Sequence, residues 1–106
     1  MLTPEEKKIL GGLKNNLLKL TDILEIKLFG SRTRVDHSHD SDYDILIVVP
    51  TLSHRLKKKI REMVWETGFE HDMFISALIV SRKEWYESPL KVSPIKKAIE
   101  KEGVFV

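Results

Sequence analysis

The sequence contains no cysteine. That absence excludes a disulfide scaffold, a thiolate zinc site and a cysteine nucleophile, and it agrees with the cytoplasmic location that we expect. No apolar run approaches the roughly 20 residues that a membrane-spanning helix needs, so we expect no membrane partner. The early acids Glu5 and Glu6 are not typical of a secretory signal peptide. Basic and acidic residues nearly balance, 18 against 16, so net charge alone does not indicate nucleic-acid binding.

What the sequence does contain is typical of one small globular domain. Of its 106 residues, 42% are hydrophobic and 32% are charged, which separates it from disordered and fibrous chains. The length suits one domain, and no linker or repeat divides it, so we expect a single domain over residues 1–106.

Apolar residues recur at helical spacing in three parts of the chain. In the first, Thr3 can cap a helix and Pro4 suits the first helical position, with the apolar stripe running to Leu20. The second runs from Leu52, and we expect Gly68 to close it. The third lies at 92–101, where we expect a short helix. A short helical turn is also predicted at 81–86.

Three further segments have the patterns of strands. Residues 23–29 alternate between apolar and polar side chains, and residues 42–49 end in an apolar run that indicates a central strand. Residues 69–80 are rich enough in apolar and β-branched residues for a long third strand. The order helix, strand, strand, helix, strand, helix predicts an α/β (α+β) fold, a small mixed sheet with helices packed on one face.

Acidic residues at the start of the second predicted strand carry the chemical signal. Asp42 and Asp44 are two residues apart, so on a strand both carboxylates share a face. Two such charges need a cation between them, and oxygen ligands of this kind suit Mg²⁺. Upstream, Gly30 and Ser31 follow the first strand, where a glycine permits close approach to a phosphate. Arg32 and Arg34 are nearby charge partners for the phosphates.

A third carboxylate would complete a two-metal site. Asp72 is the candidate, because we place it near the start of the third strand, on the face that Asp42 and Asp44 share. Glu70 is the alternative third ligand.

These residues resemble the nucleotidyltransferase superfamily related to DNA polymerase beta, and within it the minimal nucleotidyltransferases. That family has Gly-Ser at a strand end, about ten loop residues, Asp-x-Asp on the next strand and a third Asp on a later one. The closer pattern, Gly-Ser-Arg-x-Arg-x-Asp and then Asp-Ser-Asp-x-Asp, is matched at 30–36 and 40–44, and Glu-Gly-Val is matched at 102–104. In place of the family's usual Ala and Gly, this chain has Thr33 and Val35.

The resemblance implies an enzyme that transfers a nucleoside monophosphate, AMP from ATP in the first instance, to an acceptor hydroxyl. It implies two Mg²⁺ ions, or Mn²⁺ in their place, held by Asp42, Asp44 and Asp72, with Gly30 and Ser31 on the phosphates. It also implies a small all-helical HEPN toxin as the partner, a tyrosine on that toxin as the acceptor, and the role of antitoxin for this chain.

Two alternatives of other classes stay open. The chain could neutralise its partner by contact alone, with a vestigial nucleotide site. A basic run at 55–61 is most simply the solvated face of the second helix, but it also fits an acidic partner or RNA, although we do not expect nucleic acid. Trp65, Phe69 and Trp85 are most simply core or interface aromatics, and the sequence leaves a homo-oligomer open.

Overall fold

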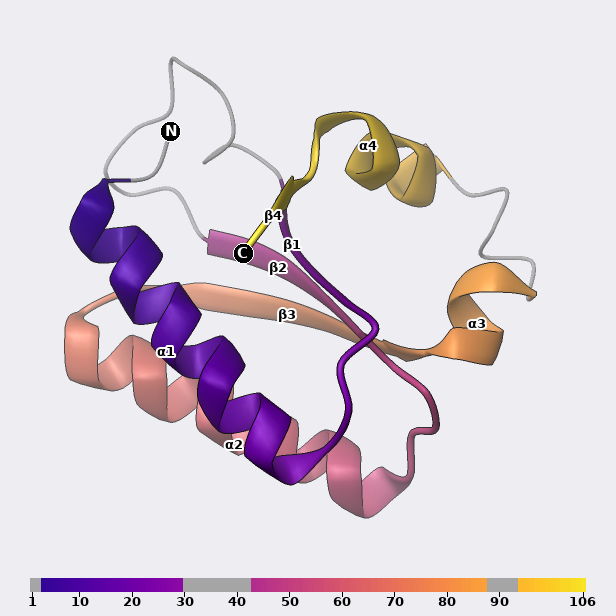
Figure 1. Ribbon diagram of the computed structural model, residues 1–106, viewed down its shortest axis with the longest axis horizontal. Helices are drawn as coiled ribbons and strands as arrows, with labels where there is room; N and C mark the ends of the chain where they lie inside the picture. The colour runs from indigo at the N-terminus through magenta and orange to yellow at the C-terminus, as the bar shows by residue number, and fades with distance from the viewer. Residues whose placement is uncertain (1–2, 30–42, 88–93) are drawn as a thin grey trace.

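The computed structural model describes residues 3–29, 43–87 and 94–106 (Figure 1). Along the chain its elements are α1 (Pro4–Leu20), β1 (Glu25–Phe29), β2 (Tyr43–Val49), α2 (His54–His71), β3 (Ile75–Ser81), α3 (Arg82–Tyr86), α4 (Pro94–Glu102) and β4 (Val104–Phe105). Within these residues the sheet has the strand order β3-β2-β1-β4. β2 is parallel to β3 and antiparallel to β1, so the predicted mixed sheet and α/β fold class are confirmed.

The two faces of the sheet are covered by different helices (Figure 1). α1 and α2 lie side by side on one face, over a cluster that includes Leu13, Leu17 and Ile60. On the other face Leu46 and Val48 of β2 pack in a smaller cluster with Trp85 of α3 and Ile99 of α4. The sequence predicted helices on one face of the sheet. The two long helices do share one face, but the short C-terminal helices pack on the opposite face.

α1 begins where the sequence predicted. Thr3 accepts a hydrogen bond from the backbone N–H of Glu6 at 3.1 Å, and the Glu6 carboxylate accepts one from the Thr3 backbone N–H at 2.8 Å. This reciprocal pair satisfies two amide donors that an uncapped helix would leave without partners. The helix then continues through Gly11 and Gly12 to Leu20 without interruption.

The predicted end of the second helix at Gly68 is wrong. α2 continues to His71, and its cap is Asp72, which has the left-handed backbone conformation with φ 55°. Gly68 has a different role, because a Cβ there would lie 2.6 Å from the carbonyl oxygen of Met73. The glycine lets the chain after α2 pass close to the helix. Because α2 continues to His71, the third strand begins at Ile75 rather than at residue 69.

The C-terminus adds a strand that the sequence analysis missed. After α4 the chain turns at Gly103, whose N–H donates to the Ile99 carbonyl oxygen at 2.7 Å, and β4 then pairs antiparallel with β1. α4 is held by Lys96, a buried lysine whose ammonium donates to the Trp85 carbonyl oxygen at 2.5 Å. None of the helices in the described ranges is long and apolar enough to span a membrane.

Candidate active site

Of the predicted Gly-Ser and Asp-x-Asp residues, Asp44 is the one that lies in the described part of the chain. It is the second residue of β2 and is half-buried. Side chains alternate along a strand, so Asp44 shares its face with Leu46 and Val48, which belong to the smaller cluster. The sheet therefore directs this carboxylate to the face opposite α1 and α2, at the end where β2 begins.

Strands on both sides bring other parts of the chain to Asp44. Phe29, the last residue of β1, is its antiparallel partner, and Ser76 of β3 is its parallel partner. The predicted phosphate-binding pair Gly30-Ser31 follows Phe29 directly in the sequence. Consecutive Cα atoms are about 3.8 Å apart. The predicted pair therefore starts at the residue next to Phe29, the strand partner of Asp44.

The predicted residues between β1 and β2 lie outside the described residues: Gly30, Ser31, Arg32, Arg34 and Asp42. The pairing of β2 with the chain before β3 extends at least to Tyr43, whose N–H donates to the Phe74 carbonyl oxygen at 2.7 Å. Ser76 is a site neighbour that the sequence analysis did not single out. No local signal marks it, because its place beside Asp44 depends on the register between two strands.

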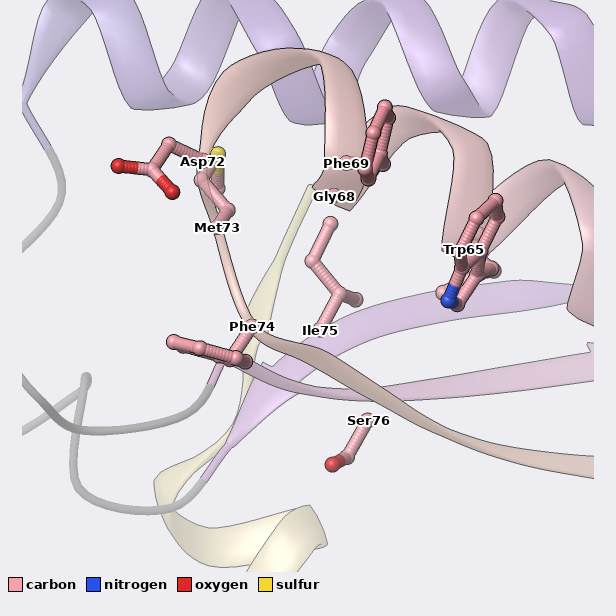
Figure 2. Close-up of a pocket in the computed structure, with 9 residues that line it drawn as sticks. Trp65, Gly68, Phe69, Asp72, Met73, Phe74, Ile75 and Ser76 are labelled. Carbon is pink, nitrogen blue, oxygen red and sulfur yellow. The ribbon is translucent and has the colours of Figure 1, made fainter.

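The predicted position of Asp72 on the third strand is wrong. The residue caps α2, three positions before β3, and its side chain is exposed. Figure 2 shows the Asp72 carboxylate at the end of α2, whereas Ser76 extends from β3 away from that helix. α2 covers the face opposite the one to which Asp44 belongs, so the shared-face argument for Asp72 as a third ligand fails.

Glu70 does not replace it, because it lies on α2 and faces a groove against α1 that also contains Glu5 and Lys8. Among residues 3–29, 43–87 and 94–106, no three acidic, histidine or cysteine side chains gather closely enough to hold a metal ion.

Tyr43 takes the position that strand alternation gives it. It precedes Asp44 and points to the opposite face, where it is buried in the larger core. Its hydroxyl donates a hydrogen bond to the Glu6 carboxylate in the first turn of α1. Glu6, which pairs with the N-cap Thr3, is therefore also an anchor for the start of β2, and it joins distant parts of the sequence.

Comparison with protein families identifies a domain family for this chain. Residues 6–106 match the model of the nucleotidyltransferase domain. Comparison with curated proteins found no match. The family model spans nearly the whole chain, including the strand that carries Asp44 and the end of β1 beside it. The chain therefore belongs to the nucleotidyltransferase domain family and has the fold of a minimal member of the polymerase beta-like superfamily.

Proposed function

We propose that the protein transfers AMP from ATP to an acceptor hydroxyl in a reaction that depends on Mg²⁺. One observation carries this proposal: in a chain of the nucleotidyltransferase family, Asp44 lies at the start of a central strand and pairs with Phe29, which Gly30-Ser31 follow in the sequence. A carboxylate and a Gly-Ser pair at the same end of two neighbouring strands suit a nucleoside triphosphate with its cation.

The oxygen atoms available at the start of β2 fit a hard cation. Asp44 and Ser76 are partners in the register between β2 and β3, and Asp42 adds a second carboxylate two residues earlier in the sequence. All are oxygen donors, which Mg²⁺ prefers and Mn²⁺ accepts. When bound, the cation would neutralise phosphate charge and polarise the α-phosphate. We assign the metal to Asp42 and Asp44, and we do not assign it to Asp72.

The remaining roles concern the triphosphate and the acceptor. Gly30 and Ser31 hold the β- and γ-phosphates, and Arg32 and Arg34 balance their charge. The acceptor oxygen attacks the α-phosphorus, its proton leaves to solvent, and the bond from that phosphorus to pyrophosphate breaks. Positioning and charge neutralisation dominate such a reaction, so a small domain is sufficient.

The acceptor that we propose is a tyrosine on a small helical HEPN toxin, which this chain would silence as its antitoxin. This proposal rests on the resemblance to the minimal nucleotidyltransferases, in which a partner protein supplies the acceptor. Residues 6–106 match the transferase domain itself, so no part of that match supplies an acceptor.

The test is transfer of label from α-labelled ATP to the product of the neighbouring gene, with Mg²⁺ present. We expect Asp44→Asn to lower the rate by about 10²–10³-fold, because the carboxylate that holds the cation is neutralised. Asp22→Asn is the matched control, since Asp22 is an exposed acid outside the helices and strands. Chelation of the metal should abolish transfer in the wild type.

Two results would contradict the proposal. If the partner binds tightly but receives no label, the chain acts by contact alone. If label is transferred equally by wild type and Asp44→Asn, the reaction does not use this carboxylate.

A further inference from the structure

An exposed stripe runs along α2, and the proposed reaction does not use it. We define the α2 stripe as Lys58, Arg61, Trp65, Phe69 and Asp72, all of which are exposed. Trp65 is 66% exposed and Phe69 is 76% exposed. Their rings stack on each other, with centroids 5.3 Å apart and planes 14° apart. Two stacked aromatic rings on a solvent-facing helix are unusual unless another surface covers them.

The aromatic part of the stripe lies beside an open sheet edge. Figure 2 shows Trp65 and Phe69 above β3, in a groove that Gly68 and Ile75 also line. In the part of the chain that the structure describes, no strand pairs with the outer side of β3. An aromatic helix face next to a strand edge is a surface that natural proteins usually cover.

The charges of the stripe are arranged about Trp65 in a way that complements itself. Arg61 is four residues before Trp65 and Phe69 is four after, whereas Lys58 is seven before and Asp72 is seven after. In an antiparallel pair of identical helices centred on Trp65, residues equally far from the centre face each other. Arg61 of each copy would then face Phe69 of the other, and Lys58 would face Asp72.

Each of these contacts is favourable. A guanidinium over an aromatic ring is a cation–π contact, and Lys58 with Asp72 is an ion pair. The two tryptophans would meet on the symmetry axis. Within the described residues, no ion pair or hydrogen bond engages the side chains of Lys58, Arg61 or Asp72, so these charges are available.

We propose that the α2 stripe is the interface of a twofold symmetric homodimer, in which two copies pack α2 against α2 in antiparallel orientation with Trp65 at the axis. From Lys58 to its cap Asp72 the stripe follows α2 for about 20 Å, which is long enough for an extended helix–helix contact.

A second copy fits the stripe better than nucleic acid does. Lys58 and Arg61 beside exposed aromatics would suit a single-stranded nucleic acid. The same stripe ends in Asp72, and exposed Glu62 and Glu66 flank it, so phosphates would meet repulsion along half of its length. A second copy instead brings Lys58 to Asp72.

The dimer leaves the proposed active site open and does not depend on the proposed function. The stripe belongs to α2, whereas Asp44 points to the opposite face of the sheet. A failure of the transferase assay would therefore not remove the dimer, and a failure of the dimer would not remove the transferase.

The first experiment measures molar mass by sedimentation equilibrium from about 1 to 100 µM protein. We expect the wild type to approach the mass of two 12.3 kDa chains as concentration rises. Trp65→Ser should weaken the dimer more than about tenfold. Phe105→Ser is the control, since Phe105 is an exposed aromatic residue of β4, at the other edge of the sheet, and it should leave the dimer unchanged. Circular dichroism verifies that both variants are folded.

The second experiment tests the antiparallel register. Lys58→Glu and Asp72→Lys should each weaken the dimer, because each places like charges opposite each other. The double variant should restore dimerisation toward the wild-type constant. A wild type that stays monomeric throughout overturns the proposal, as does a dimer indifferent to Trp65→Ser. A monomer that binds single-stranded RNA through Trp65 would show that the stripe serves nucleic acid instead. Single-variant losses without restoration would refute the proposed register.

Discussion

The two faces of the sheet differ in how completely they are covered. The face under α1 and α2 is packed along its length, and Tyr43, Ile45, Ile47 and Val49 of β2 are all buried there. On the other face Leu46 and Val48 are buried, but the first β2 residue on that face is the half-buried Asp44. The comparison shows how a small domain can separate its tasks. One face supplies most of the buried apolar surface, and the end of the other face presents a carboxylate for chemistry.

The largest predicted effect concerns the covered face. Leu17→Ala should lower the free energy of unfolding by about 2–5 kcal/mol, because it leaves a cavity in the larger core. The neighbouring Leu18→Ala is the control, since Leu17 is 0% exposed and Leu18 is 47% exposed on the same helix. Denaturant unfolding measures both. Equal losses at the two positions would contradict the assignment of the α1 side that faces the sheet.

A smaller loss is expected where α2 meets the chain that leads into β3. Gly68→Ala should destabilise the protein by about 1–3 kcal/mol, because the new methyl group would crowd the Met73 carbonyl oxygen, which is 2.6 Å from an ideal Cβ. The same unfolding measurement checks it. An unchanged stability would mean that the close approach after α2 is not a constraint.

Gly12→Ala should have the opposite sign. An added Cβ at Gly12 meets no atom within 4 Å, so the substitution removes only the conformational freedom of glycine in the unfolded chain. Within a helix, we expect a gain of about 1 kcal/mol in the free energy of unfolding. A loss of stability would indicate that α1 is distorted at this position.

The smallest effect concerns the less covered face at high pH. Tyr86 of α3 donates a hydrogen bond to Glu25 of β1, and this bond, with burial, raises the pKa of Tyr86 to about 12. Because the pKa of Tyr86 is higher in the folded protein, its protonated hydroxyl stabilises the fold. This stabilisation is complete below pH 10, the ordinary tyrosine pKa, and is lost as the pH rises toward 12. Ultraviolet difference titration should show this tyrosinate forming near pH 12 in the wild type. In Glu25→Gln, the pKa of Tyr86 should move back toward 10, and an unchanged pKa would show that Glu25 is not the cause.

Local signals predicted the elements that local chemistry determines. Thr3 and Pro4 marked the start of α1, and the apolar run at 45–49 marked a central strand, because capping and burial leave direct traces in the sequence. Gly68 misled, since a glycine selected for close approach resembles one that ends a helix. The real cap is Asp72, a residue type that tolerates the left-handed conformation.

The candidate site was predictable only in part. Phe29 pairs with Asp44. This agrees with the family pattern, in which Gly-Ser follows one strand and Asp-x-Asp lies on the next. The third carboxylate was placed by assuming that Asp72 belonged to a strand, and the longer α2 removed that basis. Ser76 and the two-residue β4 depend on pairing between distant segments, which no local pattern encodes.

The most direct test of the account is calorimetric titration of the protein with ATP in the presence of Mn²⁺ or Mg²⁺. We predict binding by the wild type that requires the cation, strong weakening in Asp44→Asn and no change in Asp22→Asn. Binding that is equally tight in Asp44→Asn, or that persists unchanged after the cation is removed, would contradict the claim that the start of β2 holds the metal and its nucleotide.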